Sequence, residues 1–324
     1  MPRLRRIRYK IVDPIWKFEI SQSSFIRRYR FPPFGFRRLV RLLTPHLPRG
    51  RNCKISPTVK VAAAIRYLAS NSFQDAVADA LGVSQQSVSR FVHQVIDALV
   101  SRPIMEAAIV YPKTDQEKEL CARTFGKTIP SVWGALDGSL IAIEAPRLYP
   151  QDYRARRHGY FLNVQAVSDG RGYCLFVDAT NCGSRHDNSA YISSTSFHFE
   201  SRQQSKRFQL IADKGYQNLP VCIAMYRNPQ NRQERDLNAI IRKKRVVVEQ
   251  FFGCLKRKFK ILQNVIRVPT EYAPSVVCAC IVLSNIMLIW GFRKPIRNPN
   301  IANPNFIHSP NNCPNPRAFY AQQL

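Results

Sequence analysis

Acidic residues are scarce in this chain of 324 residues. Asp and Glu number 21 against 49 Lys and Arg, which leaves a net charge of +28 at pH 7. An excess of this size favours polyanionic partners, because basic side chains that neutralise phosphates release counterions. Nucleic acid is the polyanion we expect. A ribosomal or membrane-surface protein can carry the same balance, so charge alone does not identify the function.

The sequence also lacks a cysteine framework and a long apolar run. Its nine cysteines are an odd number without a repeating spacing, and no CxxC pair occurs. This pattern predicts free thiols, as in a cytosolic or nuclear protein. The basic N-terminal segment has no apolar stretch, so we predict no signal peptide. The longest apolar run, 276–290, is interrupted by Ser284 and Asn285 and predicts a buried core helix rather than a membrane span.

Positive charge is concentrated at the N-terminus. Residues 1–51 contain 14 Lys or Arg and two acids. The first 34 residues are interpreted as a basic arm, which is either solvated or lies on phosphates. In the second case the DNA contacts would come from Arg3, Arg5, Arg6 and Arg8.

A helical domain is predicted for residues 35–125. Apolar spacing indicates one helix over 36–47 and three more within 57–100. Gly82 separates a short amphipathic helix over 73–81 from a helix that Ser84 would cap. A helix, a glycine turn and a capped helix are typical of a helix-turn-helix, and an ordinary helical hairpin is the alternative. In a helix-turn-helix, the residues that meet base edges would be Gln85, Gln86 and Arg90.

An α/β domain is predicted for residues 126–293. Strand patterns cover 132–145, 161–168, 173–180 and 208–212, with a turn at 169–172, and a long helix is predicted over 240–262. These elements describe a sheet that begins with hairpins. The tail, 294–324, is rich in Pro and Asn, and we expect it to be irregular.

Four carboxylates stand out in this domain, each in its own motif. They are Asp137 in GALDGSL, Asp187 in GSRHDNS, Asp213 in LIADKGY and Glu249 in VVVEQFFGCLKRKF. A buried carboxylate is costly unless it is paired or binds a cation. Asp137 and Asp213 follow apolar strand residues, so they can meet at one edge of a sheet. Glu249 is predicted to point from a largely apolar helix face, and Asp187 is either a helix cap or a ligand.

Oxygen ligands of this kind suit Mg²⁺ or Mn²⁺. Two such ions about 4 Å apart can activate a water and stabilise the leaving oxygen of a phosphodiester. The basic residues around Glu249 either form a solvated helix face or hold the nucleic-acid backbone. We predict DNA contacts from Arg242, Lys243, Lys244, Arg245, Lys256, Arg257 and Lys258.

The ordered motifs resemble those of a known family. GALDGSLIAIEAP, NVQAVSD, GSRHDNS, LIADKGY and VVVEQFFGCLKRKFKIL are similar to the blocks of PIF/Harbinger transposases and Harbinger transposase-derived nucleases, over residues 35–290. The resemblance implies an RNase H-like catalytic core of the DDE type. It also implies that Asp137, Asp213 and Glu249 form a catalytic triad and bind two divalent cations, with Asp187 as an additional metal ligand.

Two functions remain open on this basis. The first is a divalent-metal-dependent nuclease or transposase that cleaves DNA phosphodiester bonds. The second is a transposase-derived DNA-binding protein that keeps the core as a scaffold. An RNA-binding protein would explain the charge but not the acids. The resemblance further implies work in the nucleus, with the cytoplasm as the alternative, and a separate Myb/SANT-like protein as partner. Leu140 and Ser284 stand where the family usually has His, and neither change touches the four acids.

Overall fold

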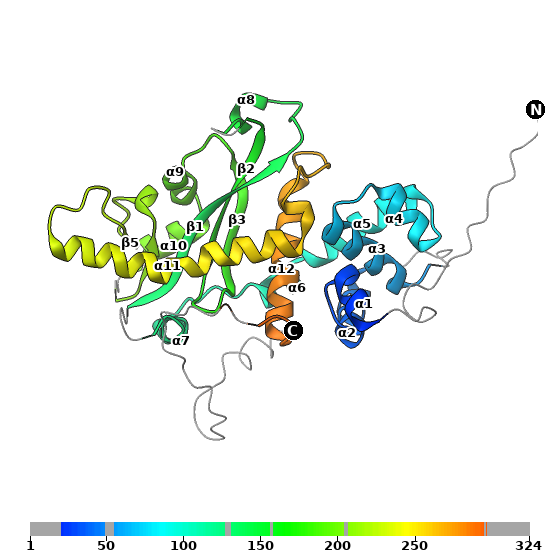
Figure 1. Ribbon diagram of the computed structural model, residues 1–324, viewed down its shortest axis with the longest axis horizontal. Helices are drawn as coiled ribbons and strands as arrows, with labels where there is room; N and C mark the ends of the chain where they lie inside the picture. Colours follow the sequence, from blue (N-terminus) through cyan, green and yellow to red (C-terminus); the bar gives the residue numbers. More distant parts are fainter. Residues whose placement is uncertain are drawn as a thin grey trace, which may run out of the picture. The chain divides into compact units, whose positions relative to one another are not determined.

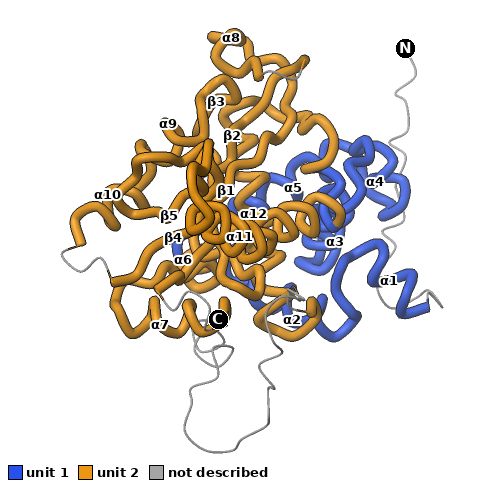
Figure 2. Tube along the Cα trace, turned by 60° about the vertical axis from the view of Figure 1, so that its left-hand side comes forward, with its two compact units in different colours: residues 1–102, 258–261 blue, residues 103–257, 262–324 orange. Residues whose placement is uncertain are grey.

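The computed structural model describes residues 21–48, 55–126, 131–155, 158–203, 207–294 and 296. It divides into two compact units, residues 1–102 with 258–261 and residues 103–257 with 262–324 (Figure 2). The predicted arm contacts Arg3, Arg5, Arg6 and Arg8 and nearly all of the predicted tail lie outside the described residues. No helix in the described ranges is long and apolar enough to cross a membrane.

The first unit is helical. Its elements are α1 (Gln22–Tyr29), α2 (Pro33–Leu43), the short helix η1 (Thr44–His46), α3 (Pro57–Ser70), α4 (Gln74–Leu81) and α5 (Gln85–Leu99). Helix α3 is buried along most of its length and packs against α4 and α5. Pro57 opens α3, where its missing N–H costs nothing, and the Ser56 hydroxyl accepts a hydrogen bond from the Val59 N–H.

The connection between α4 and α5 forms as the sequence predicts. Gly82 ends α4 in the left-handed conformation, with φ 65°, which costs glycine little. The Ser84 hydroxyl accepts from the Ser87 N–H at 3.2 Å and caps α5. The apolar face of α5 is buried. Two helices joined by residues 82–84 are therefore confirmed.

The second unit is built around a five-stranded sheet (Figure 1). Its strands are β1 (Val132–Ile143), β2 (Tyr160–Ser168), β3 (Cys174–Cys182), β4 (Gln209–Ala212) and β5 (Cys222–Ala224). Its helices are α6 (Arg102–Ala108), α7 (Asp115–Arg123), α8 (Pro150–Tyr153), α9 (Asp187–Ile192), α10 (Thr195–Ser201), η2 (Lys214–Tyr216), α11 (Arg232–Lys258) and α12 (Ala273–Ile289). The short helix η3 (Lys260–Leu262) falls mostly in the first unit.

The strand order is β3-β2-β1-β4-β5. Strands β1, β2 and β3 are antiparallel neighbours, and β4 and β5 run parallel to β1. The hairpins predicted at the start of the sheet are confirmed. The carboxylate of Asp169 accepts the N–H groups of Arg171 and Tyr173, both at 2.9 Å, and so forms the predicted turn between β2 and β3.

Helix α7 belongs with the sheet rather than with the N-terminal helical domain, where the sequence placed it. It packs against β1, and its Lys118 forms a buried ion pair with Glu200 of α10 at 2.8 Å. The compact units divide at residues 102 and 103 rather than near residue 125. A capping box of Thr114 and Glu117 starts α7, and this local signal does not reveal which core the helix joins.

Two long helices complete the unit. Helix α11 crosses the sheet in Figure 1 and begins eight residues before the predicted start at residue 240. Helix α12 is buried on nearly all sides, which confirms the predicted core helix. Asn285 within it accepts the Cys174 N–H at 3.0 Å and donates to the Cys174 carbonyl at 2.8 Å. This amide ties α12 to the first residue of β3.

Candidate active site

Asp137 lies in the middle of β1, beside Gly138. Consecutive strand residues point to opposite faces of a sheet. A Cβ added to Gly138 would lie 2.5 Å from Oδ1 of Asp187 and 2.6 Å from the Gln165 amide. The face of Gly138 is therefore covered by Asp187, and the side chain of Asp137 points to the other face, toward α11.

Asp213 follows β4, the parallel neighbour of β1. Ala135 pairs with Ile211, so Asp137 and Asp213 each lie two residues beyond a paired position. The backbone at Asp213 stays extended, with φ −73° and ψ 168°. Because side chains alternate along extended chain, Asp213 shares the face of Asp137. Asp137 in the middle of β1 and Asp213 just after the end of β4 therefore lie at neighbouring positions of adjacent parallel strands.

Glu249 reaches the same face from α11 through a shared cation. Nη1 of Arg245 lies 3.1 Å from Oδ2 of Asp137, and its Nη2 pairs with Oε1 of Glu249. One guanidinium thus bridges two acids from separate elements. The Glu249 side chain is 47% exposed, so the prediction that it points from an apolar face was wrong. The apolar stripe of α11 runs through Ile241, Val248 and Phe251, and Glu249 lies beside it.

The electrostatics of Asp137 follow from this crowding. Burial raises the pKa of its carboxyl to about 6, while the Arg245 guanidinium and the Gly138 N–H oppose that rise. The charges of Glu249 and Asp187 raise the pKa further. The pKa of about 6 means that the Asp137 carboxyl ionises at higher pH than an ordinary aspartate does.

Asp187 is held on the Gly138 face by two side-chain amides. It is the first residue of α9, whose cap position is His186, so it is not the helix cap itself. Its Oδ1 accepts from Asn163 at 2.9 Å and from Gln165 at 3.2 Å. The Tyr216 hydroxyl donates to the side-chain oxygen Oε1 of Gln165 at 2.6 Å, which fixes the orientation of that side-chain amide.

Sequence reasoning missed Asn163, Gln165 and Tyr216 as part of this site. Burial and the charges of Asp187 and Asp137 raise the pKa of Tyr216 well above its usual value, so it remains a hydrogen-bond donor. A signal was present: Asn163 and Gln165 alternate with apolar residues in β2, although both faces of that strand are buried. A polar pair in such a strand must find partners.

The described residues contain no group of three or more His, Cys, Asp or Glu side chains already gathered to hold a metal ion. Asp137 and Glu249 instead share the guanidinium of Arg245, and Asp187 is held by two side-chain amides. Assignment of the metal and catalytic roles to Asp137, Asp187, Asp213 and Glu249 stays a prediction.

The basic residues of α11 divide into two groups. Lys244 is buried, and its ammonium donates to the Phe125 carbonyl. Lys256 donates to the Leu140 carbonyl at 3.0 Å, and Arg245 is engaged by the acids. Lys244 is not displayed as the sequence predicted, because it lies on the buried face of the helix. The exposed members are Arg242, Lys243 and Arg257, and Lys258 is half-buried.

The predicted base-contacting residues lie at the start of α5. Gln85, Gln86 and Arg90 are all exposed. The Gln85 amide donates to the Gln74 side chain of α4 at 2.8 Å, so its orientation is set within the helix pair.

Comparison with known proteins identifies the class of protein to which this chain belongs. The DDE superfamily endonuclease family matches residues 136–285, a range that contains all four acids. Among curated proteins, "Putative nuclease HARBI1" of Homo sapiens is 30% identical over 307 residues, covering 90% of this chain and 86% of the relative. The Xenopus laevis protein of the same name is 29% identical over 289 residues, covering 86% and 82%.

This chain therefore belongs to the family of Harbinger transposase-derived nucleases, as the motifs predict. No solved structure matched it.

Proposed function

We propose that this protein is a divalent-metal-dependent nuclease that cleaves DNA phosphodiester bonds. The observation that carries the proposal is the convergence of Asp137 and Glu249, from a central strand and a long helix, on one cationic group. Asp213 follows the adjacent strand on the same face. The strand order β3-β2-β1-β4-β5 supports an RNase H-like core, in which two strands and a late helix supply the acids.

The donor set fits a hard cation on one face of the sheet. Carboxylate oxygens are the ligands that Mg²⁺ and Mn²⁺ prefer. Arg245 already places positive charge between Asp137 and Glu249, where a bound ion would do the same. We assign the metal to Asp137, Asp213 and Glu249. When bound, the ion would activate water and stabilise charge on the leaving oxygen.

Asp187 fits the ligand role less well than the other three. Its carboxylate faces Gly138 and the amides of Asn163 and Gln165, on the far side of β1 from the Asp137 side chain. Its charge still reaches Asp137 and raises the pKa of that carboxyl. We propose that Asp187 supports the site by positioning β1 and by adding negative potential that favours a divalent cation.

The chain's own residues have distinct tasks in this scheme. Arg245 neutralises Asp137 and Glu249 before a metal arrives, which limits their mutual repulsion. The exposed Arg242, Lys243 and Arg257 of α11 are suited to hold phosphates on the substrate. In the other unit, we propose that α4 and α5 act as a helix-turn-helix in which Gln85, Gln86 and Arg90 meet base edges.

Nicking of supercoiled DNA tests the proposal. We expect wild-type protein to nick with Mg²⁺ or Mn²⁺ and to be inactive with EDTA. Asp137→Asn and Glu249→Gln should each lower the rate by at least about a hundredfold while leaving DNA affinity similar or higher, since an acid is lost from a basic surface. Asp236→Asn, which removes an exposed acid elsewhere on α11, is the matched control and should nick normally. Nicking that survives in the first two variants would contradict the proposal.

A second candidate is a DNA-binding protein that keeps the core as a scaffold. The observation in its favour is that Arg245 already satisfies Asp137 and Glu249, so the fold does not require a metal. DNA binding without cleavage under any divalent cation would select it. Under either function, we propose that the protein works in the nucleus and that a Myb/SANT-like protein assists it. Co-purification from nuclear extract of cells that express both would test this.

A further inference from the structure

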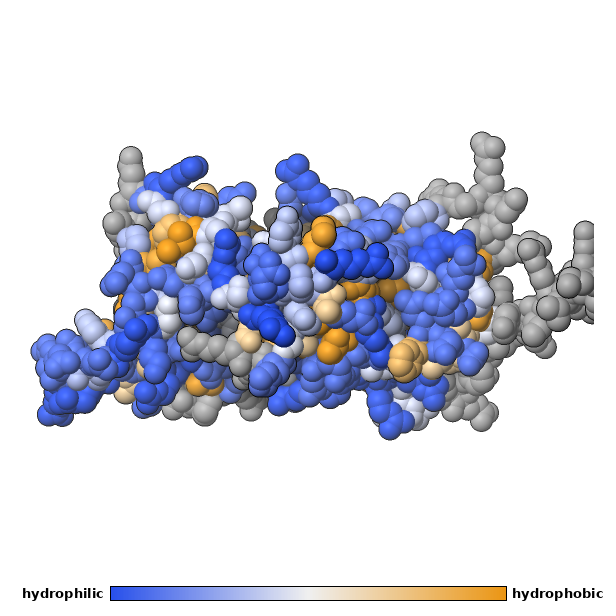
Figure 3. All heavy atoms as spheres, turned by 90° about the horizontal axis from the view of Figure 1, so that it is seen from above, coloured by the Kyte–Doolittle hydropathy of each residue, from blue (hydrophilic) through white to orange (hydrophobic). Residues whose placement is uncertain are grey.

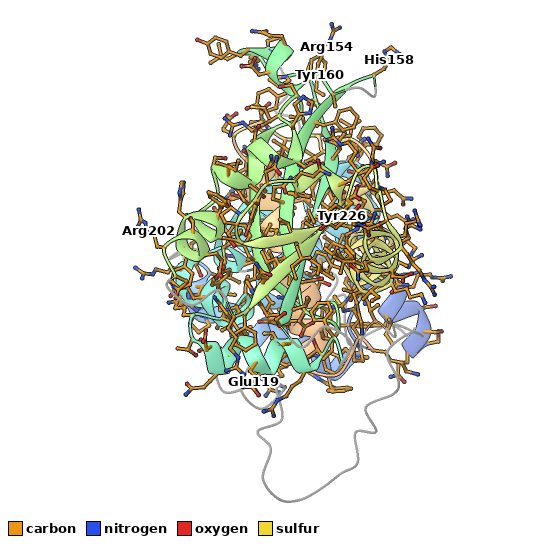
Figure 4. All side chains as sticks on the ribbon, turned by 90° about the vertical axis from the view of Figure 1, so that its left-hand side faces the viewer. Glu119, Arg154, His158, Tyr160, Arg202 and Tyr226 are labelled. Atoms are coloured by element: carbon orange, nitrogen blue, oxygen red, sulfur yellow. The ribbon has the colours of Figure 1, made fainter. Side chains whose placement is uncertain are left out.

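The connection between β1 and β2 is unusually long for neighbouring antiparallel strands. Strand β1 ends at Ile143 and β2 begins at Tyr160, whereas hairpin loops commonly have about two to five residues. We call residues 144–155 and 158–159 the β1–β2 arm. It contains α8, which lies beyond the strand ends in Figure 1, and Arg154 and His158 lie beside Tyr160 at this end in Figure 4. Long loops inside compact domains are commonly functional.

The arm displays apolar side chains to solvent. Leu148 is 74% exposed and Tyr149 is 69% exposed, the two highest values for large hydrophobic side chains among the residues that the structure describes. Arg147, Arg154 and His158 of the arm are also exposed, and so are its two acids, Glu144 and Asp152. Seen from above the view of Figure 1, the molecular surface is mostly hydrophilic with small hydrophobic spots (Figure 3). An exposed Leu–Tyr pair flanked by cations fits a partner with both apolar rings and negative charge.

The backbone at Tyr149 adds a second observation. Its φ of 49° and ψ of 49° lie in the left-handed region, which is strained for a bulky residue. Pro150 follows and starts α8, so the strain occurs at the point where the ring is presented outward. Strained residues of this kind concentrate at binding and catalytic sites.

The base of the arm is anchored against the segment that leads to Asp187. The Ser184 N–H donates to the Asp152 carbonyl at 3.1 Å. A Cβ on Gly183 would lie 2.7 Å from the Tyr153 carbonyl oxygen, so only glycine lets the arm pack here. Gly183 and Ser184 open the motif GSRHDNS, which carries Asp187. The arm leaves the sheet at the carboxyl end of β1, six residues beyond Asp137.

We propose that the β1–β2 arm binds DNA whose bases are unstacked beyond the cleavage site, on the side of the carboxyl end of β1. Tyr149 and Leu148 would stack on exposed bases, and Arg147 and Arg154 would contact the flanking phosphates. This inference rests on the proposed function and names the form of substrate that it uses. Bases of an intact duplex are covered by their neighbours, so an aromatic ring reaches a base face only where the stack is open.

A metal-free binding titration separates this inference from cleavage. Two duplexes that share one strand are compared. One is fully paired, and the other has a short unpaired bubble that contains 2-aminopurine. We expect wild-type protein to prefer the bubble and to change the 2-aminopurine fluorescence by stacking. Tyr149→Asn should lose about tenfold in bubble affinity and little on the paired duplex. Asn tolerates the left-handed backbone, so this change removes the ring without adding strain.

Three further variants sharpen the result. Tyr149→Phe keeps a ring and should retain the preference. Arg147→Ala combined with Arg154→Ala should weaken both duplexes alike and flatten the salt dependence. Tyr226→Ala is the control, because Tyr226 is an exposed tyrosine of the same unit that lies away from the arm in Figure 4 and bonds Asn238 through its backbone. It should bind like wild type.

The inference is overturned if wild type shows no bubble preference, or if Tyr149→Asn matches wild type while folding normally. It is also overturned if Tyr226→Ala loses the preference equally, or if Tyr149→Asn changes only the oligomeric state, which would make the arm a protein contact. Loss of metal-dependent nicking with the bubble preference intact would contradict the proposed function alone. If Leu148→Ala also loses the bubble preference, that loss supports the inference independently.

Discussion

Asp137 is the residue whose ionisation depends most directly on the site around it. Burial raises the pKa of its carboxyl to about 6, above the ordinary value of about 3.9. The folded protein therefore holds this proton more tightly than the unfolded chain does. The resulting stabilisation is fully present below about pH 4 and is lost as the pH rises through 6. Above that pH the ionised carboxylate destabilises the metal-free fold.

Asp137→Asn should reverse this penalty. In EDTA at pH 8 we expect the variant to be more stable than wild type by about 1–2 kcal/mol, since the amide mimics the protonated acid. At pH 4 the two proteins should be equally stable. Urea unfolding at pH 4, 6 and 8 measures the difference, with Asp236→Asn as the exposed-acid control. A variant that is less stable than wild type at pH 8 would show that Arg245 outweighs burial.

The shared cation Arg245 should affect both stability and metal binding. Arg245→Gln leaves Asp137 and Glu249 without their shared cation, so the metal-free protein should lose about 1 kcal/mol of stability. Mn²⁺ should then bind more tightly and raise the melting temperature more than in wild type, because ligand binding to the folded state stabilises it. Thermal unfolding with and without Mn²⁺ and Mn²⁺ titration by electron paramagnetic resonance measure both effects. Arg242→Gln is the matched control, and an equal response of the two variants would contradict this role.

Helix geometry separates the basic residues of α11 into buried and exposed ones. Lys244 lies three residues after Ile241 and four before Val248, so it shares their buried face. That spacing was legible in the sequence, where charge alone had suggested a DNA contact. Burial lowers the pKa of Lys244, and its ammonium satisfies the Phe125 carbonyl.

Lys244→Ala should accordingly cost stability rather than DNA affinity. We expect a loss of about 1–3 kcal/mol, because the Phe125 carbonyl is left without its partner and a packed stem is removed. Arg242→Ala, on the exposed face, should change stability little and weaken DNA binding. Chemical denaturation and a binding titration on both variants give the comparison. Equal stability of the two would mean that the Lys244 contact contributes nothing.

Much of the fold was predictable because the strands and helices carry strong periodicity. The α4–α5 connection has a glycine and a serine cap at the required positions, and β1 to β4 match their predicted ranges closely. Strand β5 was missed because three half-buried residues show no period. The bridging role of Arg245 and the amides of Asn163 and Gln165 depends on contacts between distant elements, which spacing along the chain does not encode.

For the whole molecule, we propose that the two units divide the DNA contacts between them. The helical unit offers Gln85, Gln86 and Arg90, and the sheet unit offers α11 and the β1–β2 arm. We expect Gln85→Ala, Gln86→Ala and Arg90→Ala together to change which duplex is preferred, because residues at the start of a recognition helix reach base edges. Selection from a random duplex pool before and after the change measures this. An unchanged preference would make α4 and α5 a structural pair and assign target choice to a partner.

We propose that one face of the sheet holds a divalent metal that supports DNA cleavage. Asp213→Cys tests it most directly, because a thiolate binds Mg²⁺ poorly and softer ions such as Cd²⁺ well. We predict that Asp213→Cys fails to nick DNA in Mg²⁺ and recovers activity when Cd²⁺ is added, while Asp213→Ala stays inactive in both. Full activity of either variant in Mg²⁺, or no recovery of Asp213→Cys with any softer ion while DNA binding is intact, would contradict the account.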